Sequence, residues 1–323
     1  MLRRTFIATL TAPALAAYAQ QPVIRSQSRL VMVPVTVVDV SGSYVPDIAA
    51  DDFLLLDDGT PRQVRVDTPD TGVAPISLIV AVQQAALSAA VLAKVRKVGA
   101  MIQPLITGDR GEAALIAFDE DLHVVLDFTS DPAAISDAFA RLTTGSPAPS
   151  GRMLDAVQLA AKMFADRRKD SRRVLLIISE SRDRGSKTKF EGALQLAQQE
   201  GIVVYAATYS AYATAFTARS KDLPPPDYEG DILTGIVEAS RNAKKKAAQE
   251  LALETGGAHF SFLKQSGLDR IITETGADLH SQYILSFTPP NDAAPGPHRI
   301  EVRVKGSDKY RIRARRAYWL AAE

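Results

Sequence analysis

The chain has 323 residues, enough for one large domain and a smaller one, and its 46% apolar and 23% charged residues are ordinary for a globular protein. A net charge of +1 gives no basis for binding nucleic acid or an anionic membrane, because both require a clustered basic excess. The absence of cysteine excludes disulfides, thiolate catalysis, iron–sulfur clusters and Cys-ligated zinc.

Residues 1–19 have the pattern of a signal peptide. Arg3 and Arg4 form a positive start, residues 6–17 form a short apolar core, and Ala17-Tyr18-Ala19 matches the small-x-small cleavage pattern. The core is too short to cross a bilayer as an anchor. The arginine pair also fits a twin-arginine signal, so general secretion and twin-arginine export both remain open. We therefore expect a protein exported to a periplasm or outside the cell, with no membrane span after cleavage.

Residues 20–72 read as antiparallel β-structure. Residues 30–39 form a long β run in which Pro34 cannot donate to a ladder, which predicts an edge strand or a bulge. Residues 52–56 and 63–66 flank the turn Asp57-Asp58-Gly59 and predict a hairpin. No helical pattern separates these strands, so they predict a small β unit.

Residues 73–280 have a different pattern. The uninterrupted apolar run Ile76 to Val82 suits a strand buried on both faces, and residues 173–178 and 202–207 repeat this character. Helix-like stretches alternate with these runs, over residues 86–105, 131–142, 153–165, 190–200, 239–254 and 268–279. Residues 113–118 and 123–128 predict a hairpin around an acidic turn. The alternation predicts an α/β domain with a doubly wound, mostly parallel sheet, whose ligands bind beyond the carboxyl ends of the strands.

Two segments complete the domain plan. Residues 210–235, which include three consecutive prolines, predict an exposed loop that is either a binding element or simply long. Residues 281–323 contain strands over 282–287, 299–304 and 310–315, with an alternation that suits an antiparallel sheet. Because β-only segments bracket the α/β part, we expect the two chain ends to form one small antiparallel β-sandwich into which the α/β domain is inserted.

Several short motifs occur in an order that resembles a known family. They are Val33-Pro34-Val35-Thr36-Val37, Asp52-Phe53, Pro75-Ile76-Ser77-Leu78, Gly108-Asp109-Arg110, Leu154-Asp155-Ala156, Gln282-Tyr283-Ile284-Leu285 and Arg313-Ala314-Arg315-Arg316-Ala317-Tyr318. In this order the chain resembles the von Willebrand factor type A fold, and more closely the bacterial exported proteins described as VWFA-related. The resemblance covers nearly everything after the signal peptide and implies the same fold class.

The resemblance also implies a metal-ion-dependent adhesion site, made in the family by an Asp-x-Ser-x-Ser stretch, a Thr and an Asp. Here the first stretch is Ala81-Val82-Gln83-Gln84-Ala85, which lacks the carboxylate and both hydroxyls. Ser150 stands near the Thr position only if its register shifts, and Glu180 takes the Asp position. Arg152 and Arg182 add positive charge, whereas a hard cation requires several well-placed oxygens. We therefore expect a degenerate site and no cofactor.

The leading hypothesis is a non-enzymatic exported protein that binds another protein or a surface polymer, but not nucleic acid, through the carboxyl edge of the sheet. Its expected binding residues are Gln83, Gln84, Ser150, Arg152, Asp155, Glu180, Arg182 and Asp183. A first alternative is a divalent-metal-dependent adhesion module that uses Glu180, Asp155 and Ser150. A second is a periplasmic hydrolase on the same sheet, although no Gly-x-Ser-x-Gly turn follows a strand.

Overall fold

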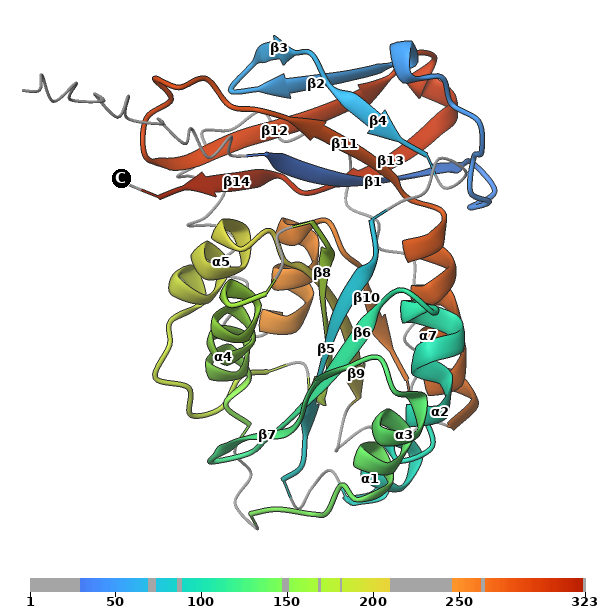
Figure 1. Ribbon diagram of the computed structural model, residues 1–323, viewed down its shortest axis with the longest axis vertical. Helices are drawn as coiled ribbons and strands as arrows, with labels where there is room; N and C mark the ends of the chain where they lie inside the picture. Colours follow the sequence, from blue (N-terminus) through green and yellow to red (C-terminus); the bar gives the residue numbers. More distant parts are fainter. Residues whose placement is uncertain are drawn as a thin grey trace, which may run out of the picture.

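The computed structural model describes residues 30–68, 74–85, 89–146, 151–167, 170–180, 182–209, 246–262 and 265–321. A β-sandwich forms one end of the molecule, and a sheet flanked by helices forms the other (Figure 1). The expected signal peptide over residues 1–19, Ser150 and the segment 210–235 lie outside the described residues.

The large sheet has six strands and is parallel except at one edge. Its order is β10 (His259–Ser261), β9 (Val203–Tyr209), β8 (Arg172–Glu180), β5 (Ile76–Gln83), β6 (Glu112–Phe118) and β7 (Leu122–Thr129), with only β7 antiparallel to its neighbour. Every residue of β5, β8 and β9 is buried. The predicted central strand and the mostly parallel sheet are therefore confirmed.

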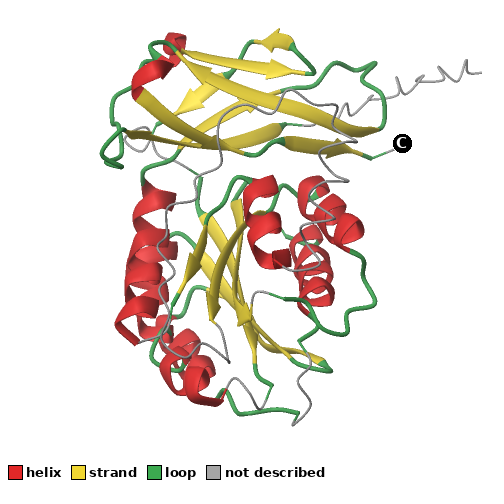
Figure 2. Cartoon of the chain, turned by 180° about the vertical axis from the view of Figure 1, so that it is seen from behind, coloured by secondary structure: helices red, strands yellow, loops and turns green. Residues whose placement is uncertain are grey.

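Helices cover both faces of this sheet (Figure 2). On one face, α4 (Met153–Ala165), α5 (Phe190–Gln199) and a helix over residues 246–255 bury side chains such as Phe164, Leu194 and Leu251. On the other face lie α1 (Ala89–Val95), α2 (Gly99–Ile102), α3 (Pro132–Ala140) and α7 (Gln265–His280). Because helices cover both faces, the loops at the ends of the strands are the accessible parts of the central strands β5, β8 and β9.

The helix expected over residues 86–105 is not continuous. Its described part turns after α1, resumes as α2 and ends in a π-helix, η4 (Gln103–Thr107), which contains Pro104. A Cβ atom on Gly99 would lie 2.8 Å from Cβ of Phe139, so α2 packs unusually close to α3. The apolar spacing correctly identified the buried face, but this close packing and the proline, which lacks an N–H donor, accompany a break that the spacing does not show.

The two chain ends form the expected sandwich. One sheet has the order β13 (Tyr310–Ala314), β1 (Val31–Asp39), β11 (Tyr283–Phe287) and β4 (Arg65–Asp67), and the other has β14 (Ala317–Leu320), β12 (Gly296–Val304), β2 (Phe53–Asp57) and β3 (Thr60–Arg62). Val33, Leu55, Tyr283 and Leu285 are among the side chains buried between the sheets. The α/β part is therefore inserted between strands that belong to one sandwich.

Some details of the sandwich differ from expectation. The hairpin partner of β2 is β3, directly after the turn, whereas β4 crosses to the other sheet and pairs with β11. Pro34 lies in a strand with neighbours on both sides, but β13 pairs only with residues 35–39. The proline therefore occupies a local edge, as its missing donor requires. Strand β14 was not expected, because four residues give too little alternation to recognise.

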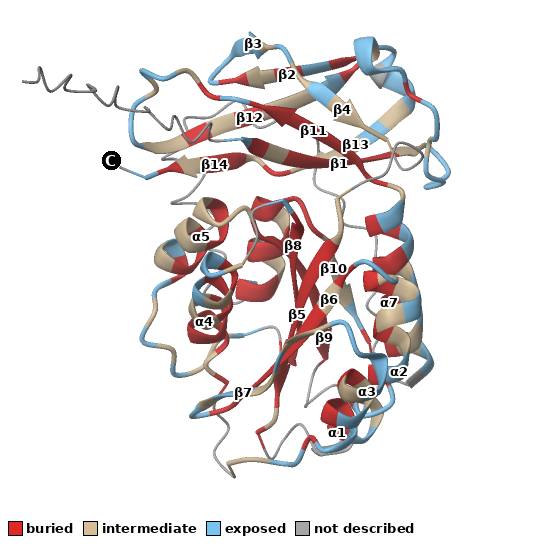
Figure 3. Cartoon of the chain, in the orientation of Figure 1, coloured by how far each residue is buried: buried red, intermediate tan, exposed pale blue. Residues whose placement is uncertain are grey.

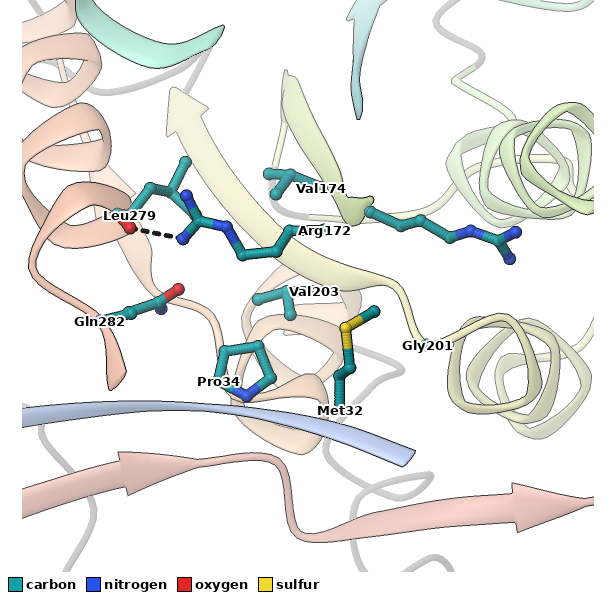
Figure 4. A pocket seen from close by; sticks show the side chains of 9 residues that line it. Met32, Pro34, Arg172, Val174, Gly201, Val203, Leu279 and Gln282 are labelled. Carbon is teal, nitrogen blue, oxygen red and sulfur yellow. Dashed lines mark hydrogen bonds between the residues drawn. The ribbon is translucent and has the colours of Figure 1, made fainter. Parts of the chain in front are cut away.

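Two arginines lie at the junction between the sandwich and the amino end of the large sheet, and Arg313 of β13 bonds across it. The helices antiparallel to the strands end at this junction, where their free carbonyls favour cations. Nη1 of Arg172 donates to the carbonyl of Leu279 at 2.6 Å, and Nε of Arg313 donates to the carbonyl of Gly256 at 3.3 Å. Figure 4 shows Arg172 reaching Leu279 beside Pro34 and Met32 of β1, around a cavity of about 20 Å³.

Asp278 is the buried acid of this junction. It accepts hydrogen bonds from Thr36 of the sandwich at 2.9 Å, from Tyr205 of β9 and from Arg313 of β13. Its carboxylate thus connects three elements from both parts of the molecule. The sandwich covers the amino ends of the strands, and their carboxyl ends face away from it (Figure 1).

Candidate functional site

The expected binding residues lie around the carboxyl ends of β5, β6 and β8. These strands end at Gln83, Phe118 and Glu180, and the loops that follow them carry residues of intermediate and full exposure (Figure 3). The structure brings together seven of the eight expected residues here, and Ser150 lies outside the described chain.

Gln83 and Gln84 hold the strand ends and loops of this edge together through hydrogen bonds. Oε1 of Gln83 accepts a hydrogen bond from the backbone N–H of Glu180 at 2.9 Å, and Gln83 is buried. A Cβ on Gly151 would lie 2.4 Å from Nε2 of Gln83, so any larger residue at this position would displace the amide of Gln83. The backbone of Gln84 links Phe118 (2.9 Å) to Gly145 (2.7 Å). These residues connect the strand ends and leave little of Gln83 for a partner to touch.

The acidic turn after β6 places one acid inside and two outside. Asp119 is buried, and its two carboxylate oxygens accept the backbone N–H groups of Asp121 at 2.9 Å and Ser146 at 2.8 Å. Glu120 and Asp121 are exposed. Asp119 therefore shapes the loop, and the exposed charge of the turn is negative.

Asp155, in the first turn of α4, holds the loop that follows β8. Its carboxylate accepts the backbone N–H groups of Thr188 at 2.8 Å and Lys187 at 3.0 Å, and Nε of Arg152 at 2.7 Å. Burial on its own raises the pKa of this carboxyl, but the hydrogen bonds from Thr188, Lys187 and Arg152 outweigh it and lower the pKa to about 2. Asp155 is thus a charged structural anchor.

Asp183 caps the same helix from another loop. Its Oδ1 accepts the backbone N–H of Leu154 at 3.0 Å and the hydroxyl of Ser186 at 2.6 Å. The Ser186 hydroxyl in turn accepts the N–H of Asp155 at 3.2 Å. A carboxylate at a helix N-terminus satisfies free N–H groups and interacts favourably with the helix dipole. The expected binding residues Asp155 and Asp183 therefore both point into the protein.

Glu180 and Arg184 form an ion pair at this edge in which a carboxylate oxygen has no hydrogen-bond partner. Glu180 is 6% exposed, and its Oε2 has no hydrogen-bond partner among the described residues. Nε of Arg184 lies 3.6 Å from that oxygen, and the Arg184 side chain is 35% exposed. Backbone hydrogen bonds with Gly151, at 3.0 and 3.1 Å, fix the position of Arg184. Arg184 was not among the binding residues expected from the sequence, although it follows Glu180 by only four positions.

The oxygen atoms at this edge are not arranged to coordinate a hard divalent cation. Such an ion requires several oxygens that converge on one point. The acids Asp119, Asp155 and Asp183 are bonded to backbone N–H groups, and Oε1 of Gln83 is bonded to Glu180. Oε2 of Glu180 is buried without a hydrogen-bond partner among the described residues, and a guanidinium lies beside it.

Comparison with known families agrees with this architecture. Residues 81–182 match the model of the von Willebrand factor type A domain. This range contains the carboxyl end of β5 and all of β6, β7, α4 and β8, and it ends where the loop after β8 begins. No curated protein matches the sequence.

Solved structures with a similar arrangement share little sequence. An aerotolerance-related membrane protein from Bacteroides fragilis is 16% identical, with 62% of this chain and 98% of that chain covered, at a TM-score of 0.44. A von Willebrand factor type A protein from Catenulispora acidiphila is 10% identical, with 93% of this chain and 76% of that chain covered, at a TM-score of 0.45.

Within the described ranges, no helix is both long and apolar enough to cross a membrane.

Proposed function

We propose that this chain, which carries a von Willebrand factor type A domain, is an exported, non-enzymatic protein that binds another protein or a surface polymer. Binding takes place through the loops at the carboxyl edge of the six-stranded sheet and requires no metal ion. The observation that carries the proposal is the edge itself, where Asp155 and Asp183 bond inward to backbone N–H groups while the loops remain exposed.

The arrangement of histidines supports a non-enzymatic function. His259 lies on β10 and contacts the hydroxyl of Thr208 at 2.8 Å. His298 lies in the sandwich, where Nδ1 is 2.8 Å from Asp58. His123 is exposed at the start of β7 and stands opposite Ala117, at the carboxyl edge, but among the described residues its ring makes no hydrogen bond to an acid or a nucleophile, as a hydrolase base would require. A screen with ester, phosphoester and peptide substrates tests the hydrolase alternative, which requires turnover that Asp155→Asn or Glu180→Gln abolishes.

One observation favours the metal-dependent alternative. The unpartnered Oε2 of Glu180 is the kind of buried acceptor that a cation would satisfy. Against it stands Arg184, because a guanidinium 3.6 Å away already supplies positive charge to that oxygen. We therefore propose that Arg184, and not a metal ion, neutralises the charge of Glu180.

Partner capture tests the proposal. The chain from Gln20 onward is immobilised and exposed to surface proteins and surface polymers of the source cells in EDTA and, separately, in Mg²⁺. We expect the same partner in both buffers, with capture weakened by Arg182→Glu at the edge and unchanged by Arg270→Glu, an exposed control on α7. Capture only in Mg²⁺, equal capture by the two variants, or no capture at all would refute the proposal.

Export is tested separately. A reporter fused after residues 1–19 should leave the cytoplasm, and replacement of Arg3 and Arg4 by Lys should stop it only if the twin-arginine route is used. A reporter that stays in the cytoplasm would contradict the exported location.

A further inference from the structure

The loop between β8 and α5, residues 182–189, has an unequal distribution of charge. Its bases Arg182, Lys187 and Lys189 are exposed, and Arg184 is 35% exposed. Its one acid, Asp183, bonds inward to the N-terminus of α4. Although the whole chain is almost neutral, this loop therefore presents mainly positive charge to solvent.

The basic side of the loop is held in a fixed shape. Asp155 binds the backbone N–H groups of Lys187 and Thr188, and Gly151 binds the backbone of Arg184 on both sides. Gly185 has φ of +97°, a conformation that favours glycine and turns the chain between Arg184 and Ser186. A partner would meet cations whose backbone positions are already ordered, which lowers the entropic cost of binding.

Arg184 provides a directional contact within this surface. Its Nε faces Glu180, and its terminal N–H groups make no hydrogen bond among the described residues. The ion pair with Glu180 orients the guanidinium, whose planar arrangement of N–H groups can make two parallel hydrogen bonds to a carboxylate. The half-exposed side chain can therefore offer two parallel donors to an incoming acid.

The neighbouring turn limits the size of the partner. Arg152 donates to the carbonyl of Glu120 at 2.8 Å, and a Cβ on Gly185 would lie 3.8 Å from its Cγ, so the acidic turn and the basic loop are close. Exposed Glu120 and Asp121 would repel a long polyanion laid across the edge. A short acidic segment can pair with residues 182–189 without crossing that turn.

We propose that residues 182–189 form a docking surface for an acidic protein segment, with Arg184 binding a glutamate or aspartate carboxylate directly. The inference rests on the proposed function and adds the chemistry of the partner. Nucleic acid and anionic membranes are less suited to a small basic surface that is bordered by acids.

The test uses fluorescence anisotropy with a labelled Glu-Gly repeat peptide and the matched Gln-Gly peptide, in EDTA. We compare the full mature chain with a variant carrying Arg182→Gln, Arg184→Gln and Lys187→Gln. A control variant carries Arg270→Gln, Lys305→Gln and Lys309→Gln, three exposed bases outside the edge, and has the same change in net charge. Thermal melting establishes that both variants are folded.

We expect the wild-type chain and the control variant to bind the Glu peptide and not the Gln peptide, and the loop variant to bind it about tenfold more weakly. Affinity should fall as salt rises, because these charges are exposed. Equal binding by the two variants, no binding of the Glu peptide, or tighter loop-dependent binding of duplex DNA or phosphatidylserine vesicles would overturn the inference. The proposed function would survive that result if partner capture in EDTA still depended on the edge.

Discussion

Asp155→Asn tests whether the candidate site is held together by one buried carboxylate. The substitution preserves the size of the side chain but removes its charge. It also replaces one oxygen, which accepts hydrogen bonds, with an amide N–H₂ group that can only donate them. The present carboxylate binds two backbone N–H groups, at 2.8 and 3.0 Å, and Nε of Arg152 at 2.7 Å. Because Asp155 is only 6% exposed, water cannot easily replace these bonds.

The expected loss follows from the pKa of this carboxyl. Hydrogen bonding outweighs burial and lowers the pKa from 3.8 to about 2, and at about 1.4 kcal/mol per pKa unit the folded state favours the charged form by about 2.5 kcal/mol. We therefore expect Asp155→Asn to reduce the free energy of unfolding by about 2.5 kcal/mol at neutral pH. Urea unfolding followed by circular dichroism measures this difference.

The dependence on pH provides a second readout. The folded-state pKa of Asp155 lies below the unfolded value, so its contribution is complete above about pH 4 and is lost as the pH falls toward about 2. The difference in stability between the wild-type chain and Asp155→Asn should shrink over that range. The exposed Asp166→Asn, just after α4, is the matched control and should change stability by less than about 0.5 kcal/mol. A similarly small loss for Asp155→Asn, or a difference that does not change with pH, would refute the reasoning.

Two further substitutions test the junction with the sandwich and the packing of α7. Asp278→Ala leaves the partly buried guanidinium of Arg313 without its carboxylate and should cost about 3 kcal/mol in urea unfolding, at the lower end for a buried pair. A loss below about 1 kcal/mol would show that the junction is not stabilised by this pair. Gly276→Ala places a Cβ 2.0 Å from the carbonyl oxygen of Leu105, so it should lower the melting temperature despite the better helix propensity of alanine. Gly192→Ala in α5 is its control, because the nearest atom to the added Cβ would be 3.9 Å away. This substitution should stabilise the protein by about 1 kcal/mol through helix propensity. Equal effects of the two glycine substitutions would contradict the packing argument.

Hydrophobic patterning predicted most of the fold because burial in this protein follows the simplest rules. The buried strand β5 appears as an unbroken apolar run, and the alternation in residues 299–304 identifies part of β12. Patterning did not predict the break in residues 86–105, because it depends on how closely Gly99 approaches Phe139. It also did not predict that β4 pairs with β11, because strand pairing across the two sheets is decided by contacts distant in sequence.

The candidate site was less accessible from the sequence. Residue types at the strand ends identified the edge, since the position of a site in this fold follows from strand order. They did not show that Asp155 and Asp183 point inward, because that depends on N–H groups supplied by other loops. The pairing of Glu180 with Arg184 needed the bridge between Gly151 and Arg184, which no local pattern indicates.

Metal titration tests the central claim, that this edge binds its partner without a metal ion. The mature chain from Gln20 is titrated with Mg²⁺, Mn²⁺ and Ca²⁺ by calorimetry and thermal melting, beside Glu180→Ala as the control. We predict no saturable binding at millimolar ion concentrations and no rise in melting temperature, because the oxygens at the edge are bonded to N–H groups and Arg184 lies beside Glu180. Saturable binding that raises the melting temperature and disappears in Glu180→Ala would contradict the account.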